Sequence, residues 1–469
     1  MSNMKKIFST EETIEKHLHK IYLVLALFIG TMLSLAMPLF NEPDGQYHYT
    51  ISTNMVGLSN DLSAYGEPNI GSGMFRQVPN YQSGTFFEKY FKSEIKEMPI
   101  EDLPRAAFIP PKTSYNYWGH LLPAIGVKLG HAIYPSIGVM IVIARLLSSF
   151  ICAILMFLII KWVKAGKLLF TVVSLSPVIT NTFASLSYDA TTYILSAFAI
   201  AFTINMIVRK QLRLCDVWYL GISIISLTLG AKTNLKLLIL LPTFVMLLIY
   251  LVQEKHNSRF GLFIDKIKSQ LKRKKWINWK SSMYVVIFIL VLSIVFLIMK
   301  PTVAFSLYRI TIGYWINITP GLSVSSIFQS LLAAPYANFN HLPYWVSAIW
   351  YILLIIVVLV EKRFVESLLI SWFAFLVFLG GVVAVFYSFV IQPTISDYVE
   401  VHRFLGAVEG VQGRYFTPTL LLLPLVTGNE KFQLRIRPYR LTVIISIAVI
   451  IITNIMLVFS TLFGIYFLY

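Results

Sequence analysis

The sequence contains few charged residues and almost no cysteine. Asp, Glu, Lys and Arg make up only 13% of its 469 residues, while 57% are hydrophobic. An average soluble domain has roughly 25% charged and 45–50% apolar residues. This balance excludes an ordinary soluble protein. Cys152 and Cys215 fall in or beside apolar blocks, so they predict no structural disulfide and indicate no redox compartment.

The common catalytic signatures are also absent. The chain has no Walker loop, no HExxH, no CxxC pair and no Ser-based elbow, so motif evidence for these enzyme classes is missing. The net charge of +17 would suit a nucleic-acid-binding protein. However, the basic residues lie at the ends of apolar blocks, where the positive-inside rule places them. We therefore attribute the charge to membrane topology and expect no nucleic-acid partner.

The apolar residues gather in blocks long enough to cross a bilayer, which takes about 20 helical residues. Uninterrupted apolar runs of this length indicate helices, because backbone polar groups need partners inside lipid. We predict an all-α integral membrane protein with about eleven transmembrane helices. The predicted spans are 21–40, 138–162, 168–186, 190–208, 216–231, 235–252, 283–299, 344–360, 364–391, 416–427 and a block that closes the chain. Residues 119–137 are semi-apolar and look interfacial or re-entrant.

Loop charges predict the orientation. Residues 253–282 carry nine Lys or Arg against two acids, which marks a cytoplasmic loop. Alternating sides then makes 1–20 a cytoplasmic tail and 21–469 one polytopic domain. Three long loops share the opposite face: the large first loop at 41–118, then 300–343 and 392–415. We predict a multi-pass membrane protein with a cytoplasmic N-terminus.

Chemistry-bearing residues follow the first span directly. Glu42, Asp44 and His48 lie beside a Pro-Gly turn at the predicted outer surface. A carboxylate there could act as general base toward a sugar hydroxyl, or could bind a divalent cation such as Mg²⁺ or Mn²⁺. A helix-end cap with solvated charges is the simpler alternative. The sequence identifies no metal site and no cofactor.

Charged residues at or inside span boundaries form a second group. Asp189 lies between two apolar blocks, where it could be functional or could cap the following helix. Lys232 lies on the non-cytoplasmic side, against the charge rule, and could meet a lipid phosphate. Arg145 lies inside the second span and needs a carboxylate or a phosphate as partner.

The third candidate is the segment Gly410-Val411-Gln412-Gly413-Arg414-Tyr415. Two glycines let the backbone approach a ligand closely, and Arg414 can bind a phosphate through two hydrogen bonds. An interfacial turn anchored by an Arg-Tyr pair is an equally good interpretation.

Together these motifs resemble the bacterial membrane protein family called domain of unknown function 2142, over about residues 20–430. The family shows Pro-Asp-Glu-x-x-His after the first span, where Pro43, Asp44 and His48 match but Gly45 replaces Glu. The remaining matches are Ser187 with Asp189, Lys232, Arg145-Leu146-Leu147, and Gly410 through Phe416 without a gap. The last match is the most specific.

The family looks like a branch of the GT-C superfamily, membrane glycosyltransferases that use polyprenyl-phosphate sugars. The resemblance implies a bacterial plasma-membrane protein that transfers a sugar from such a donor to a cell-envelope glycopolymer, such as teichoic acid or a wall polysaccharide, at the outer face of that membrane. A lipid-sugar synthase and a small flippase would be its partners. The missing Glu puts a paired-carboxylate role in doubt; the adjacent Glu42 could substitute for it, and Asp44 is the favoured base.

In this hypothesis the other site residues have supporting roles. Glu42, His48 and Asp189 would orient the acceptor or bind a cation, or Asp189 would position one of the phosphate-binding cations. The donor phosphate would be bound by Arg414, Lys232 and Arg145, with Gln412 and Tyr415 beside them. Sugar rings would stack on Tyr47, Tyr117 and Trp118.

Two other classes of protein remain open. A lipid-linked-glycan flippase or transporter would also be polytopic, but it should show broken helices and polar residues near the bilayer midplane. A polysaccharide polymerase or ligase would share the outer-face site, and only a donor assay would separate it.

Overall fold

The computed structural model describes residues 2–40, 42, 44–62, 84–103, 109–254, 327–335, 342–391, 411–432, 434 and 439–463, with isolated positions between 291 and 316. These residues are helical and contain no strand; the isolated bridges Asn60–Glu97 and Val365–Asn429 are the β-type pairings found among them. The prediction of an all-α fold is confirmed for this part of the chain. The predicted span 283–299 and most of the loops 253–282, 300–343 and 392–415 lie outside it.

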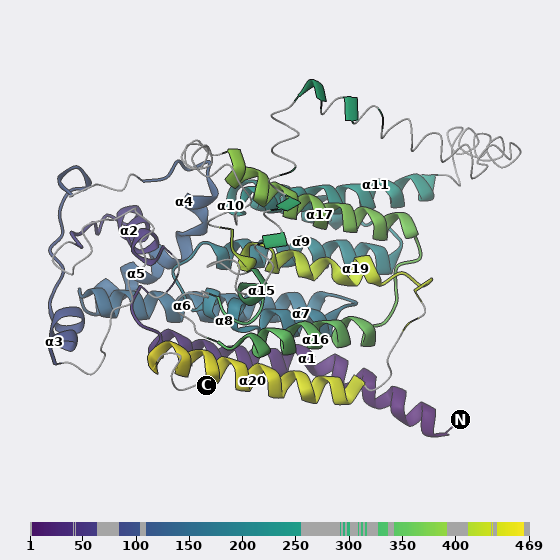
Figure 1. Cartoon of the computed structure of the whole chain (residues 1–469), viewed down its shortest axis with the longest axis horizontal. Coiled ribbons are helices and arrows are strands. Elements are labelled where there is room, and N and C mark those ends of the chain that lie inside the picture. The colour runs from purple at the N-terminus through teal and green to yellow at the C-terminus, as the bar shows by residue number, and fades with distance from the viewer. Residues whose placement is uncertain are drawn as a thin grey trace, which may run out of the picture.

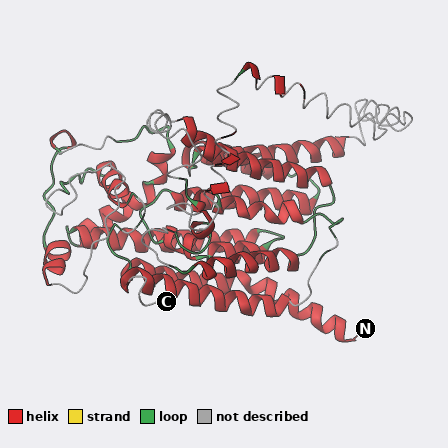
Figure 2. Cartoon of the chain, viewed as in Figure 1, coloured by secondary structure: helices red, strands yellow, loops and turns green. Residues whose placement is uncertain are grey.

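The long helices lie side by side along the long axis of the molecule, with most loops at its two ends (Figures 1 and 2). In chain order the elements are α1 Ser2–Ala36, α2 Gly45–Met55, α3 Gly84–Phe87, η2 Glu88–Lys92, η3 Ile100–Asp102, α4 Tyr115–Gly119, α5 Leu121–Ile133, α6 Ile137–Trp162, α7 Lys167–Ser174, α8 Pro177–Phe183, α9 Asp189–Arg209, α10 Leu214–Gly230, η4 Thr233–Ile239, α11 Leu240–Glu254, α15 Ile327–Ser330, α16 Tyr344–Val360, α17 Leu368–Ile391, η5 Gly413–Tyr415, η6 Thr417–Leu422, α19 Leu423–Thr427 and α20 Tyr439–Phe463.

Six helical segments in the described part are long and apolar enough to cross a membrane. They are Thr13–Ala36, Ile137–Trp162, Asp189–Arg209, Thr233–Leu251, Leu368–Phe389 and Tyr439–Phe463. Four shorter apolar helical segments accompany them: Leu121–Ile133, Leu214–Gly230, Tyr344–Val360 and Thr417–Thr427. A multi-pass membrane protein is therefore the architecture, and the larger number of eleven spans stays a prediction.

The predicted span 168–186 is wrong as a single helix. It forms two short helices, α7 and α8, with a break at Leu175 and Ser176. Pro177 causes the break, because it lacks an N–H and disfavours helical geometry in the residue before it. The Asn454 side-chain amide of α20 donates to the freed Leu175 carbonyl at 3.1 Å. The break is fully buried and its backbone is bonded, so it serves packing.

Residues 119–137 fold back as a helical hairpin. Helix α5, of 13 residues, packs antiparallel on the start of α6, with Gly126 against Ala144 and Gly130 against Met140. A Cβ atom on either glycine would come within 2.6 Å of the α6 backbone, which shows how close the two helices are. The hairpin explains the semi-apolar composition: one face of α5 is buried, while Ile125, Leu129 and Ile133 are exposed.

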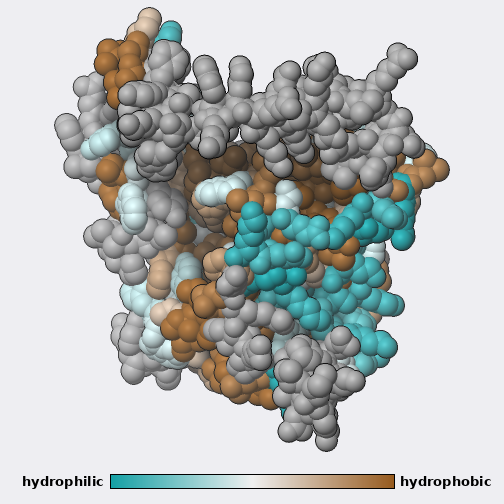
Figure 3. Space-filling view, turned by 90° about the vertical axis from the view of Figure 1, so that its right-hand side faces the viewer, coloured by the Kyte–Doolittle hydropathy of each residue, from teal (hydrophilic) through white to brown (hydrophobic). Residues whose placement is uncertain are grey.

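The basic turns between spans meet at one end of the bundle. There Lys362 pairs with Glu15 at 2.7 Å, and Lys210 pairs with Glu366. Hydrophilic side chains gather on this face, which carries the N-terminus (Figure 3). Helices α2 to α4, which begin within the first loop, and the hairpin helix α5 lie at the other end (Figure 1). The described chain thus separates the basic turns from the polar first loop, as the charge pattern predicts.

Candidate functional site

A buried ion pair fixes the start of the first loop against the membrane helices. Arg145 on α6 donates to the carbonyls of Met37 and Pro38 and lies 2.5 Å from Glu42 Oε2. The other Glu42 oxygen accepts from the backbone N–H of Leu186 at 3.3 Å. Both charged side chains are at most 3% exposed. The sequence left either a carboxylate or a phosphate as the partner of Arg145. In the structure that partner is the Glu42 carboxylate.

Because Glu42 also holds the turn before α9, it brings Asp189 close to the first loop. Asp189 begins α9, and its Oδ1 lies 2.6 Å from Lys232 Nζ. Its Oδ2 lies 3.6 Å from Arg414 Nη1. All three charged side chains are 13% exposed or less. Three residues far apart in the sequence therefore form one charged cluster: one carboxylate between two cations.

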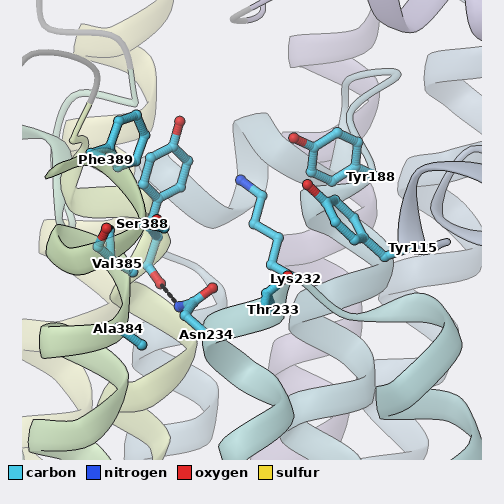
Figure 4. A pocket seen from close by; sticks show the side chains of 10 residues that line it. Tyr115, Tyr188, Lys232, Thr233, Asn234, Ala384, Val385, Ser388 and Phe389 are labelled. Atoms are coloured by element: carbon cyan, nitrogen blue, oxygen red, sulfur yellow. Dashed lines mark hydrogen bonds between the residues drawn. The ribbon is translucent and has the colours of Figure 1, made fainter. Parts of the chain in front are cut away.

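Tyrosine rings enclose the ammonium group of this cluster. Lys232 Nζ lies 3.9 Å from the centre of the Tyr415 ring and 4.9 Å from that of Tyr188. A cation over aromatic faces is stabilised by the ring quadrupole, most strongly where water is excluded. Tyr115 packs edge-on against Tyr188 at 5.2 Å between centroids. Figure 4 shows Lys232 projecting between Tyr115 and Tyr188 on one side and the residues of α17 on the other.

The cluster borders a cavity of about 250 Å³. Tyr115, Tyr188 and Lys232 line one side of it (Figure 4). Helix α17 and the start of η4 line the other, through Thr233, Asn234, Ala384, Val385, Ser388 and Phe389. The Asn234 amide donates to the Tyr415 carbonyl at 3.4 Å, which ties η4 to the Arg414 segment. The cavity is thus charged and aromatic at one end, and uncharged with both apolar and small polar side chains at the other.

Gly413 positions Arg414 because its backbone packs against Ser330 and Leu331. Its N–H donates to Ser330 Oγ at 2.7 Å, and a Cβ atom at this position would lie 2.4 Å from the Leu331 backbone nitrogen. Thr417 then donates to the Leu331 carbonyl at 2.6 Å. The sequence predicted that the backbone at this glycine approaches a ligand closely. In the structure it approaches the backbone of α15 instead. Gly410 lies outside the described residues.

Asp44 is the carboxylate that the structure leaves available. No described side chain forms a hydrogen bond or an ion pair with it, although Arg414, Lys232 and Asp189 all act on it electrostatically. Burial raises the pKa of the Asp44 carboxyl above its ordinary value; the two cations lower that pKa and Asp189 raises it further. Asp44 adopts a left-handed backbone with φ of 57°. Gly45 is held so close that a Cβ atom would lie 2.9 Å from Phe40 Cα, so a glutamate would not fit here without a backbone shift.

His48 is engaged with His120, a residue that sequence reasoning missed. His48 Nδ1 lies 2.7 Å from His120 Nε2, and both rings are buried. The other nitrogen of His120 donates to the Asn116 carbonyl. Burial lowers the pKa of His120 to about 4, although the Asn116 contact opposes the shift. His120 is thus neutral near pH 7 and accepts from His48. Both rings contact Tyr188 edge-on, at 5.1 and 5.3 Å between centroids.

Of the three proposed stacking residues, Tyr117 and Trp118 contact each other, and only Tyr47 is placed beside the charges. Tyr47 lies close to the charged cluster, and burial, with Tyr115 and Asp44 nearby, raises its pKa to about 12. Trp118 is 39% exposed, packs on Tyr117 and donates to the Lys112 carbonyl. Tyr115 and Tyr188 line the cavity instead; both lie within three residues of positions that the sequence analysis selected.

Several buried polar atoms at the cluster make no hydrogen bond within the described chain. They are Asp189 Oδ2, Gln412 Oε1 and Arg414 Nε. Buried polar atoms are nearly always satisfied, so a group of such atoms indicates a ligand or water site. Among the described residues, no group of three or more His, Cys, Asp or Glu could hold a metal ion. The cluster therefore favours a polar ligand bound by cations and amides.

The comparison with protein families agrees with the sequence motifs. The family described as "Predicted membrane protein (DUF2142)" matches residues 105–423, well over half of the chain. The chain belongs to this family. No curated protein and no solved structure matches it. The part of this DUF2142 protein that matches contains Asp189, Lys232 and Arg414, while Asp44 and Glu42 precede it.

One substitution tests how the DUF2142 segment around Arg414 is built. We expect Gly413→Ala to destabilise the protein by about 1–3 kcal/mol, because overpacking forces backbone shifts, and to move Arg414. Thermal unfolding in detergent measures the change. Gly221→Ala is the matched control: a Cβ atom there meets nothing within 4 Å, on the interior of helix α10. If both variants unfold alike, the close contact between Gly413 and α15 does not exist.

Proposed function

We propose that this protein is a GT-C-like glycosyltransferase that moves a sugar from a polyprenyl-phosphate donor to a cell-envelope glycopolymer at the outer face of a bacterial plasma membrane. One observation carries the proposal. Two buried cations, Lys232 and Arg414, lie beside a carboxylate, Asp44, that has no hydrogen-bonding partner among the described side chains. The group lies where apolar spans begin, and a lipid phosphate sits at this depth.

In the proposed reaction Asp44 accepts a proton, and the two cations stabilise the leaving phosphate. The acceptor hydroxyl oxygen attacks the anomeric carbon, and the bond from that carbon to the phosphate oxygen breaks with inversion. The hydroxyl proton passes to Asp44. The departing lipid phosphate changes from a singly charged diester to a doubly charged monoester, so it gains one negative charge as Asp44 loses one. Fixed cations aimed at a charge that develops in the transition state are among the largest contributions to catalysis.

This exchange explains why both cations lie near two carboxylates. Asp189 holds Lys232 directly and remains its partner throughout. Asp44 acts on the same cations through space. When Asp44 takes up the proton, its attraction for Arg414 and Lys232 disappears, and the cations interact more strongly with the leaving phosphate. The neutral tyrosines exclude water, which strengthens all of these interactions.

The pH dependence of transfer follows from the raised pKa of Asp44. A base must be deprotonated, so we expect the rate to be constant at higher pH and to fall as pH decreases through the Asp44 pKa, which lies above its usual range. Rate measurements against pH on the purified protein check this. The Asp44→Glu variant should still lose activity as the pH decreases, but this limb of its pH–rate profile should have a different midpoint. His120, with a pKa of about 4, stays neutral above that value and does not produce a limb near neutrality. A limb that stays unchanged in Asp44→Glu would assign the ionisation to another group.

The phosphate site can be tested with a lipid phosphate that carries no sugar, so the identity of the sugar is not needed. We expect purified protein in nanodiscs to bind undecaprenyl monophosphate, and Lys232→Met to weaken that binding by about tenfold or more, because hydrogen bonds to charged groups contribute roughly 1.5–3 kcal/mol. Lys362→Met is the control, since Lys362 lies at the opposite end of the bundle and pairs with Glu15. Equal affinity in all three proteins would contradict the phosphate role of Lys232.

A flippase for lipid-linked glycans is the main competing function. The break between α7 and α8 is the kind of discontinuity that transporters use. Here, however, Leu175 and Ser176 are fully buried, and Asn454 bonds to the freed carbonyl. The charged residues gather beside the first loop instead. A transferase therefore accounts for more of the described side chains.

A further inference from the structure

The cavity beside Lys232 has two chemically different sides. The polar side is formed by Lys232, Tyr188 and Tyr115, with Asp189 behind the ammonium group. The other side includes Val385 and Phe389 of α17, and the Phe389 ring stacks on Tyr415 at 6.2 Å. Tyr415 therefore borders both sides, since Lys232 lies over its ring. A ligand with an anionic head and an apolar tail would match this arrangement.

The exposed residues of the lining show where the cavity opens. Thr233, at the start of η4, and Ser388, on α17, are exposed, while Val385 and Asn234 are buried. Both exposed residues lie on segments long and apolar enough to span the membrane, Thr233–Leu251 and Leu368–Phe389. They come from two different elements of the lining, η4 and α17 (Figure 4). The cavity therefore reaches the surface of the bundle between these two apolar segments.

Apolar exposure continues outward from this opening. On α17, Tyr387 is 50% exposed and Val383 38%, and on α11 Leu240 is 51% exposed. Such residues face hydrocarbon in a membrane protein. The cavity itself, at about 250 Å³, is smaller than a typical pocket for a drug-sized ligand. It has room for a head group but not for a long isoprenoid chain, which must leave it.

We propose that the isoprenoid chain of the donor lipid leaves the cavity through the opening between Thr233 and Ser388 and lies along α17. This inference rests on the proposed function, because it takes the donor to be a polyprenyl phosphate. Thr233 and Ser388 then flank the path of the chain, while Lys232 binds the phosphate. The phosphate then contacts Lys232 and the tyrosines, and the isoprenoid chain contacts apolar side chains.

The test compares two ligands that share a phosphate and differ in chain length. Undecaprenyl monophosphate and geranyl monophosphate are titrated against the full chain in nanodiscs. The variants Thr233→Trp and Ser388→Trp each fill one side of the opening from an exposed position, which leaves the core intact. We expect both to weaken undecaprenyl monophosphate binding by about tenfold, the equivalent of about two lost CH₂ contacts. Geranyl monophosphate binding should change by less than about threefold.

Ile352→Trp is the matched control, because Ile352 is exposed on α16, away from α17, and does not line the cavity. It should leave both affinities unchanged. The inference is overturned if the two tryptophan variants at the opening weaken both ligands equally, or weaken neither while Lys232→Met still weakens both. Failure of the proposed function itself gives a different result. In that case the wild type binds neither phosphate, or Lys232→Met binds both as tightly as the wild type does.

Discussion

Replacing Glu42 with glutamine is expected to lower the free energy of unfolding by about 3 kcal/mol, near the lower end of the range for breaking a buried ion pair. Arg145 is 1% exposed and would keep its charge with only the Met37 and Pro38 carbonyls as partners. The turn before α9 would also lose the acceptor that Leu186 uses. Thermal or denaturant unfolding in detergent measures the effect.

A second substitution separates the cost of the unpaired charge from the loss of the pair. In the double variant Glu42→Gln with Arg145→Met no buried charge remains, so we expect most of the lost stability to return, since an apolar replacement of a buried pair is often close to neutral. Glu15→Gln, which breaks the surface pair with Lys362, should cost less than about 1 kcal/mol. If Glu42→Gln unfolds like wild type, Glu42 does not compensate Arg145.

Asp44→Asn is expected to reduce sugar transfer by about 10²- to 10⁴-fold, the usual contribution of a general base. Asparagine suits this position better than alanine, because Asp44 has a φ of 57° and asparagine tolerates left-handed backbone. The fold should survive, since the Asp44 side chain makes no hydrogen bond with a described side chain. The measurement is turnover with a polyprenyl-phosphate sugar donor, alongside unfolding temperature.

Asp102→Asn is the matched control for Asp44→Asn, because Asp102 is an exposed carboxylate of the same loop. It should leave turnover unchanged. Loss of turnover in Asp44→Asn together with a large fall in unfolding temperature would assign Asp44 a structural role. Full turnover in Asp44→Asn would show that another group accepts the proton.

The sequence predicted the helical membrane fold because apolar blocks of spanning length have few alternatives in lipid. It also predicted that the basic turns would share one end. It did not predict the break at Pro177, where Asn454, far along the chain, bonds to the freed carbonyl. Hydropathy averages over such a break, because the flanking residues remain apolar.

The candidate site was predicted in part. Asp189, Lys232 and Arg414 were selected separately as charges at span boundaries, and the structure brings them into one cluster. Sequence spacing could not show that Arg145 and Glu42 would pair with each other. His120 was missed because a single histidine in a semi-apolar segment resembles a core residue. Only the fold places it against His48.

The most direct test of the transferase assignment is the composition of envelope polysaccharides in a strain that lacks the gene, complemented with wild type or Asp44→Asn. The account predicts that one sugar substituent disappears in the deletion, returns with wild type, and stays absent with Asp44→Asn at equal protein abundance. A deletion strain with unchanged polysaccharide, in which lipid-linked precursors accumulate on one leaflet, would contradict it and would identify a flippase.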